Sequence, residues 1–184
     1  LFPHTAQLVD NICFLHSCHG TAPDHGAAVL KMNTGSESFV RPSFGSWLLY
    51  GLGSENQNLP GFITISPTDK HGGVRNYGPA FLPSEFQGTP LGNENTRARE
   101  ASFRFLGPAR DPRQRRQLDF LRQMNQASLV SSDSELEARI ATYEMAFRMQ
   151  MAAPGILDLA GETEATRKLY GLDQPATADF GTQC

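Results

Sequence analysis

Two short, mainly apolar runs predict the strands of this chain. Residues 12–15 (Ile-Cys-Phe-Leu) are apolar throughout, and residues 62–66 (Phe-Ile-Thr-Ile-Ser) are apolar at Phe62, Ile63 and Ile65. Runs of this kind are typical of strands buried on both faces of a sheet, as in α/β folds. We therefore expect both segments in the sheet of an α/β domain, with residues 1–66 forming part of its core.

Helix signals lie before and between these runs. Residues 3–10 suit a short helix, and residues 27–32 suit another that stops at Gly35, because glycine readily adopts the left-handed conformation that ends helices. Residues 42–50 suit a third helix, opened by a Pro-Ser pair. Helices and strands thus alternate along the first part of the chain.

Residues 67–109 hold many of the prolines and glycines, including an evident turn at residues 69–73. Apolar side chains are spaced along this segment and need burial: Tyr77, Phe81, Leu82, Phe86, Phe103 and Phe105. We therefore expect a long irregular excursion packed on the domain rather than a linker.

Residues 110–184 have a helical pattern. Asp111 supplies an N-cap before a proline at the first helical position, and Gln114 completes a capping box. A second capping box, S-x-x-E, lies at residues 132–135. Each precedes an apolar stripe at helical spacing, which is Leu118, Leu121, Met124 and Leu129 in the first helix and Leu136, Ile140, Tyr143 and Phe147 in the second.

The ends of these helices are also marked. Pro154 is expected to end the second long helix, and residues 163–170 suit a last short helix closed by Gly171. Because only a few residues separate the two long helices, we expect an antiparallel helical hairpin that packs against the α/β part.

Composition excludes several classes of protein. Hydrophobic residues make up 39% and charged residues 19% of the 184 positions, which excludes a strongly disordered or fibrous chain. A net charge of −3 gives no basis for nucleic-acid binding. The basic run at residues 110–116 suits the solvated face of a helix, with acidic residues interleaved. No apolar run approaches the ~18 residues that cross a membrane.

The three cysteines suggest neither a disulfide nor a zinc site. Cys13 lies within the first expected strand and Cys18 follows it, and no CxxC or typical Cys/His spacing is present. We expect three free thiols.

Residues 16–25 concentrate reactive side chains between an expected strand and an expected helix. Ligands of open α/β sheets bind beyond the carboxyl ends of strands, and helix N-termini favour anions. We take Thr21 and His25 as candidate catalytic residues, Asp24 and His25 as candidate metal ligands, and His19 as a candidate ligand-binding residue. The alternative is structural, with His19 and His25 bracing the loop.

A long series of segments resembles, in the same order, the domain-of-unknown-function 1501 family, a bacterial group placed with the sulfatases in the alkaline-phosphatase-like superfamily. These segments are residues 1–6, 24–35, 41–62, 81–90, 135–150 and 166–171. The resemblance implies an α/β fold that is part of a three-layer α/β/α domain. It also implies an exported or periplasmic protein with a divalent metal ion.

The resemblance further implies that the chain is an interior piece of a longer protein, since most superfamily metal ligands come from segments outside residues 1–184. The sulfatase nucleophile motif Cys-x-Pro-x-Arg is missing, because Pro23 follows Cys18 at the wrong spacing and no arginine follows. Asp24 stands near the nucleophile position, where the family has asparagine. Thr21 and Ser17 are hydroxyl alternatives without a base defined by the sequence.

A second candidate region is the polar loop at residues 51–60, which follows the third helix. Asn56, Gln57 and Asn58 are candidate ligand-binding residues there, whereas the plainer interpretation is a loop whose amides satisfy their own backbone.

Two functions follow from the sequence. The first is a metal-dependent hydrolase of sulfate or phosphate esters, acting on a small molecule or a polysaccharide. The second is a non-catalytic protein that binds a polysaccharide, protein or surface component through residues 51–60.

Overall fold

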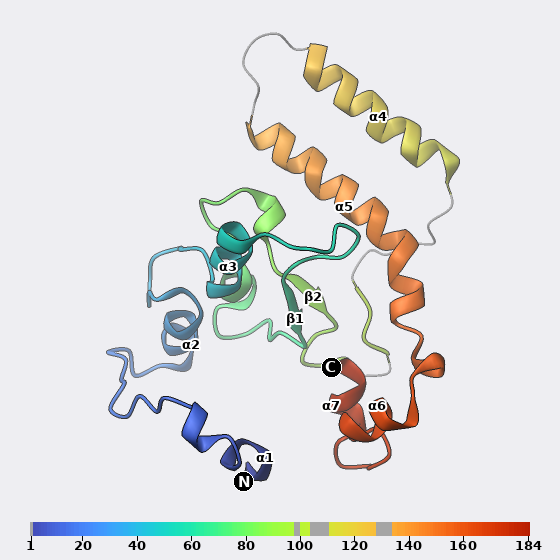
Figure 1. Cartoon of the computed structure of the whole chain (residues 1–184). Coiled ribbons are helices and arrows are strands. Elements are labelled where there is room, and N and C mark those ends of the chain that lie inside the picture. Colours follow the sequence, from blue (N-terminus) through green and yellow to red (C-terminus); the bar gives the residue numbers. More distant parts are fainter. Residues whose placement is uncertain (1, 98–99, 104–110, 128–133) are drawn as a thin grey trace.

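The computed structural model describes residues 2–97, 100–103, 111–127 and 134–184 (Figure 1). Its first half contains α1 (Pro3–Ala6), η1 (Val9–Asn11), α2 (His25–Thr34), α3 (Phe44–Leu52), β1 (Ile63–Ile65), η2 (Gly73–Tyr77), η3 (Ser84–Phe86) and β2 (Thr89–Leu91). The second half contains α4 (Pro112–Ala127), α5 (Ser134–Ile156), η5 (Leu159–Gly161), α6 (Glu164–Leu169) and α7 (Ala178–Gln183). Helices and a small sheet are combined, as the α/β prediction requires.

β1 and β2 form a two-stranded parallel sheet, with Ile63 opposite Thr89 and Ile65 opposite Leu91. β1 confirms the strand predicted at residues 62–66, whereas β2 lies in the segment predicted to be irregular. The sequence pattern does not indicate β2, because Pro90 stands at the centre of this segment. Prolines in sheets are normally confined to edge strands. Among the described residues the sheet has no further strand.

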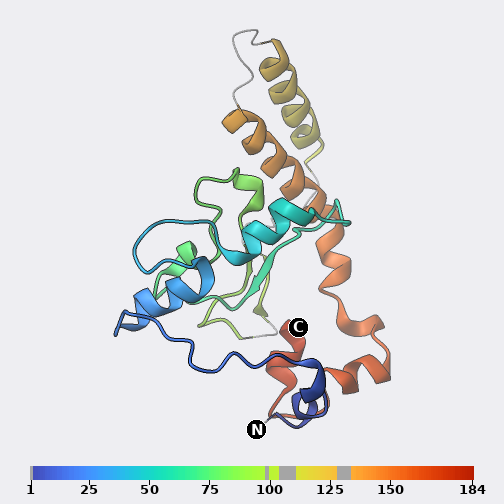
Figure 2. The same cartoon turned by 60° about the vertical axis from the view of Figure 1, so that its left-hand side comes forward.

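The strand predicted at residues 12–15 is wrong. These residues have no regular secondary structure, and the side chain of Leu15 is 77% exposed. The segment runs outside the two-stranded sheet in both views (Figures 1 and 2). An apolar run forms a buried strand only where a neighbouring strand pairs with it, and within the described ranges β1 pairs with β2 alone.

α2 and α3 confirm the predicted helices and show why they begin and end where they do. Asp24 caps α2 by accepting a 2.9 Å hydrogen bond from the amide of Ala27, and α2 ends at Gly35, whose φ is +74°. Ser43 caps α3, which continues to Leu52 and ends at Gly53, slightly later than predicted. The short helix expected at residues 3–10 is divided into α1 and η1.

α3 packs directly on the segment that leads into β1. A Cβ atom on Gly45 would overlap the ring of Phe62, so the glycine permits this close approach. The buried Ser46 donates a 3.1 Å hydrogen bond from its hydroxyl to the carbonyl of Gly78, which ties α3 to the end of η2.

α4 and α5 form the predicted antiparallel hairpin and lie side by side in both views (Figures 1 and 2). Glu144 of α5 is 4% exposed and accepts hydrogen bonds of 2.9 and 2.7 Å from the guanidinium of Arg115 of α4. The hydrogen bonds from Arg115, followed by the charges of Arg115 and Arg122, hold the pKa of Glu144 below its usual range.

α5 also packs on the sheet, through a small core of Leu91, Phe103, Met149 and Ala153. Because α5 contacts both α4 and the sheet, its buried side chains differ from the predicted apolar stripe. Ile140 is buried as predicted, but Leu136 and Tyr143 are exposed. α5 continues through Pro154 to Ile156, beyond the predicted end, although the proline has no backbone N–H to donate within the helix.

The other predictions have mixed outcomes. Phe103 is buried as expected, whereas Phe81 is 71% exposed. α6 confirms the short helix predicted at residues 163–170; Thr163 caps it and Gly171 follows it at φ +65°. The three cysteines are free. Phe105, Leu129 and residues 132–133 of the second capping box lie outside the described residues. No helix in the described ranges is both long and apolar enough to span a bilayer.

Candidate functional site

The N-terminal end of α2 brings histidines from two distant segments together. His25 is the first residue of α2, and its ring centroid lies 5.4 Å from that of His71, with the ring planes at 61°. Both side chains are exposed, and Asp24 caps the same helix end. We call Asp24, His25 and His71 the α2 corner.

The loop that leads into the corner is held by Glu37, which the sequence analysis did not single out. Its Oε1 accepts hydrogen bonds from the Thr21 hydroxyl at 2.6 Å, the Thr21 amide at 2.9 Å and the Ala22 amide at 3.3 Å. Lys31 of α2 donates another at 2.8 Å. The bond from Lys31, followed by those from Thr21, lowers the pKa of Glu37 to about 2.

These contacts bear on Thr21 as a nucleophile. Its hydroxyl has a carboxylate neighbour, which is the arrangement that activates serine and threonine nucleophiles when the neighbour is a competent base. A carboxylate with a pKa of about 2 holds a proton very weakly at neutral pH, so Glu37 orients the hydroxyl without deprotonating it. In this arrangement Thr21 is a brace of the loop.

His19 lies apart from these contacts. Its Nδ1 is 3.4 Å from the carbonyl of Ser17, and its ring is exposed. Ser17 has a φ of +67°, so the loop turns sharply just before His19.

His71 stands on a tightly constrained turn and is the residue that sequence reasoning missed. Its φ is +50°, which is unusual for a residue other than glycine, and Gly72 and Gly73 follow it with positive φ as well. Asn76 donates a 2.9 Å hydrogen bond from Nδ2 to the His71 carbonyl. A Cβ on Gly26 would lie only 3.8 Å from the His71 Cα, so this turn lies against the first turn of α2.

Asn56, Gln57 and Asn58 are not part of the corner. Oδ1 of Asn56 accepts from the amide of Asn58 at 2.8 Å, and Nε2 of Gln57 donates to the carbonyl of Ser54 at 3.1 Å. These bonds satisfy the loop's own backbone. The loop extends from the end of α3 that is remote from α2 in both views (Figures 1 and 2).

A separate aromatic surface lies on α3 and the segment after η2. Trp47 makes edge-to-face contacts with Tyr50 and Phe81, and Tyr50 makes another with Phe86. Trp47 and Tyr50 are 45% and 54% exposed, so much of their ring surface faces solvent.

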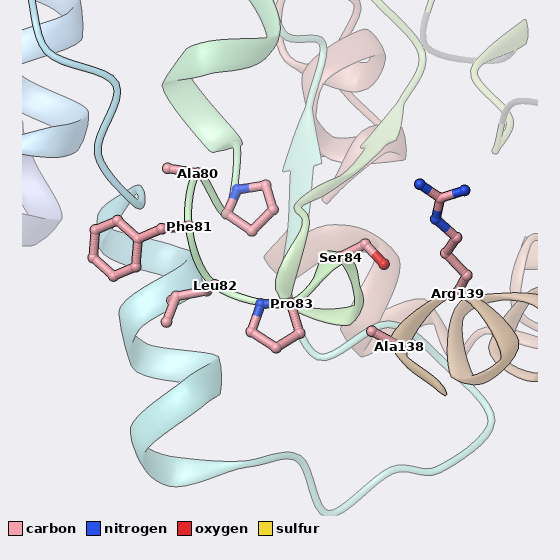
Figure 3. A pocket seen from close by; sticks show the side chains of 8 residues that line it. Ala80, Phe81, Leu82, Pro83, Ser84, Ala138 and Arg139 are labelled. Atoms are coloured by element: carbon pink, nitrogen blue, oxygen red, sulfur yellow. The ribbon is translucent and has the colours of Figure 1, made fainter. Parts of the chain in front are cut away.

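An open groove of about 510 Å³ adjoins this aromatic surface (Figure 3). Figure 3 shows Phe81 and Leu82 directed toward α3, with Ser84 on the side that faces Ala138 and Arg139 of α5. The Ser84 hydroxyl lies 3.2 Å from that of Thr142, which connects η3 to α5.

A family model described as "Protein of unknown function (DUF1501)" matches residues 1–184. The chain belongs to this family. No curated protein and no solved structure matches it significantly. Because the DUF1501 description states no activity, a function for this chain has to be argued from its own side chains.

The metal-ligating side chains of this DUF1501 chain are dispersed. Within the described ranges, no group of three or more His, Cys, Asp and Glu side chains is arranged to hold a metal ion. The α2 corner comes nearest, with two adjacent imidazoles and the carboxylate of Asp24, whose Oδ1 is engaged with the Ala27 amide.

Proposed function

We propose that this chain is part of a hydrolase of phosphate or sulfate esters whose ester group binds at the α2 corner. The observation that carries the proposal is the pairing of His25 and His71 beside the N-terminus of a ten-residue helix. The first-turn amides and the positive end of the helix dipole favour an oxyanion there. Imidazoles near that point can donate hydrogen bonds to it or transfer a proton.

The charge of Asp24 bears on the chemistry of the corner. Its carboxylate stands at the same helix end and repels an anionic ester, so an ester there is favoured only when cationic groups offset that charge. Protonated imidazoles or a bound cation fill this role. The corner therefore suits a hydrolase in which a cation lies between the carboxylate and the ester.

A complete metal centre does not fit the described residues, because they contain no trio of ligating side chains. Two imidazoles account for part of the ligand set that a zinc-type ion takes. We therefore derive no step through a metal ion. In the proposed step His25 and His71 orient the ester, and water attacks its phosphorus or sulfur atom. One imidazole accepts the proton of that water, and the other donates a proton to the departing alcohol oxygen as its bond to phosphorus or sulfur breaks.

We also propose that β1 and β2 belong to a larger three-layer α/β/α sheet. Parallel sheets are normally covered on both faces, yet Ile63 and Ile65 of β1 remain 40% exposed. Additional strands and helices would cover these side chains.

The proposal is tested by incubating the intact protein with an aryl phosphate and an aryl sulfate, with and without divalent metal ions. We expect turnover of at least one ester, and the comparison with and without added ions shows whether the imidazoles alone offset the charge of the ester. No turnover of either ester under any of these conditions would contradict the proposal.

The aromatic surface supports a second candidate, a protein that binds polysaccharide without cleaving it. Exposed rings bind sugars by stacking, and Trp47, Tyr50 and Phe81 are exposed beside an open groove. Affinity electrophoresis in polysaccharide gels tests this candidate. Phe14→Ala is the control, because it removes an exposed ring elsewhere. Retardation that is lost in Trp47→Ala and retained in Phe14→Ala, with no ester turned over, would favour polysaccharide binding over the hydrolase.

A further inference from the structure

We propose that Cys13 and Cys18 form a disulfide bond with each other when the protein meets an oxidising low-molecular-weight disulfide. Both thiols are free and exposed, and both lie in the irregular segment between η1 and α2. Sequence alone does not favour this pair, because residues 14–17 include no glycine, proline or asparagine to mark a turn. The structure nevertheless has a turn at residues 16 and 17, where the φ of Ser17 is +67°.

The residues before the turn show on which side of the chain Cys13 lies. Ile12 has an extended backbone, with a φ of −113° and a ψ of 128°. The rings of Phe14 and His16 stack with centroids 6.2 Å apart and planes at 21°, so these two side chains share one side of the segment. Because successive side chains of an extended segment alternate, Cys13 and Leu15 lie on the other side.

The turn brings Cys18 to the same side as Cys13. Where a chain reverses over two residues, the residues that flank the turn lie opposite each other and share a side. Here the flanking residues are Leu15 and Cys18, so Cys18 is the diagonal neighbour of Cys13. Diagonal neighbours are ~7–8 Å apart, and their Cβ atoms are somewhat closer. A disulfide joins Cα atoms that are ~4.4–6.8 Å apart, so a small shift closes the bond.

The segment is free to make this shift. The side chains of Phe14 and Leu15 are 53% and 77% exposed, so little packing is lost when the turn tightens. The hydrogen bonds that join Thr21 to Glu37 lie beyond Cys18 and are not part of the cross-linked loop. No residue of the α2 corner takes part, so this inference does not rest on the proposed hydrolase.

The bond forms by two successive thiol–disulfide exchanges. The thiolate of one cysteine attacks a sulfur of oxidised glutathione, and one glutathione thiolate leaves. The thiolate of the other cysteine then attacks the protein sulfur of this mixed disulfide, which forms the Cys13–Cys18 bond and releases the second glutathione. The protein gives up two electrons and two protons, and the oxidant is reduced to two thiols.

The test is oxidation of the intact folded protein in buffers of reduced and oxidised glutathione, followed by blocking of the remaining thiols with iodoacetamide. Chymotrypsin then cleaves after Phe14 or Leu15, between the two cysteines, so a Cys13–Cys18 bond leaves two peptides joined until a reductant is added. We expect this joined pair in mass spectra, with an effective thiol concentration on the order of millimolar or higher. Glutathione on both cysteines without joined peptides, or either cysteine joined to Cys184, would overturn the inference.

Variants with one cysteine removed test the second exchange. Cys13→Ser and Cys18→Ser should accumulate glutathione on the cysteine that remains, whereas the parent protein passes through this adduct only briefly. Cys184→Ser is the matched control, because it removes an exposed thiol outside the segment and should cross-link like the parent. Equal accumulation of the adduct on Cys18 in the parent and in Cys13→Ser would show that Cys13 does not attack it, and the inference fails.

Two variants of Ser17 test whether the turn brings the thiols together. Ser17→Gly retains the positive φ without strain, whereas Ser17→Val places a β-branched side chain in a conformation that it strongly disfavours. We expect the effective thiol concentration to be retained in Ser17→Gly and to fall about fivefold or more in Ser17→Val. Equal values in the two variants would contradict the placement of Cys18 by this turn.

Discussion

The hydroxyl of Thr21 donates a 2.6 Å hydrogen bond to Oε1 of Glu37, which also accepts from Lys31 at 2.8 Å. One carboxylate oxygen thereby connects the loop before α2 to a lysine of α2 itself. The same contact makes Glu37 a weak base toward Thr21, since the bonds from Lys31 and Thr21 that hold Glu37 also lower its pKa to about 2. The hydrogen bonds from Thr21 and Lys31 thus fix the position of the Glu37 carboxylate and also lower its pKa.

Stability should fall in acid through Glu37. Its folded-state pKa of about 2 lies below the ordinary value of 4.5, so its ionised form stabilises the fold above about pH 4.5, and this contribution is lost as the pH falls toward 2. We expect Glu37→Gln to lower the melting temperature at pH 7 and to have less effect near pH 2. Calorimetry from pH 2 to 7 measures this, and equal effects at both ends would contradict it.

Two variants distinguish the capping role of the Asp24 side chain from the effect of its negative charge. Asp24→Ala should destabilise α2 by about 1 kcal/mol, because the Ala27 amide loses its acceptor. Asp24→Asn retains a capping oxygen and removes the charge, so we expect near-normal stability. Urea denaturation of both variants checks this, and equal stability of the two would show that Asp24 does not act as a cap.

Two glycines of α3 should respond in opposite directions to the same change. Gly45→Ala forces a Cβ into the ring of Phe62 and should cost about 1–3 kcal/mol. Gly51→Ala adds a Cβ with no atom within 4 Å and should stabilise the helix by about 0.5–1 kcal/mol. Chemical denaturation compares the two, and similar losses in both would contradict the packing of Phe62 on α3.

The buried carboxylate of the hairpin should matter more than its exposed neighbour. Glu144→Gln weakens the paired bonds from Arg115 and should lower stability by about 2 kcal/mol. Asp119→Asn removes a surface partner of the same arginine and should have a much smaller effect. Thermal melting followed by circular dichroism distinguishes them, and equal shifts would show that burial of Glu144 does not determine its contribution.

Features encoded by local sequence were predictable. Ser43, Asp24 and Gly35 act on backbone groups within a few residues, so α2 and α3 could be placed from the chain alone. The hairpin followed from the same kind of signal, because caps and short gaps are local.

Features that depend on a distant partner were not predictable. Residues 12–15 have the composition of a strand but no strand beside them, and β2 is formed around Pro90 because β1 offers it a partner. The residues of the α2 corner also divide into those marked by local sequence and those placed by a distant partner. Asp24 and His25 were found by their place before a helix, whereas His71 is brought to them by a turn whose position depends on the packing of η2 against α2. The one local signal for His71 was a histidine followed by two glycines.

The most direct test of the account is kcat/KM for ester hydrolysis by the intact protein and two variants, His25→Ala and His16→Ala. The account predicts that His25→Ala lowers kcat/KM about a hundredfold or more while the melting temperature stays close to that of the parent. His16→Ala, which removes an imidazole outside the α2 corner, should retain nearly full activity. Unchanged turnover in His25→Ala together with a lower melting temperature would make His25 a structural brace and contradict the assignment of the α2 corner as the site of hydrolysis.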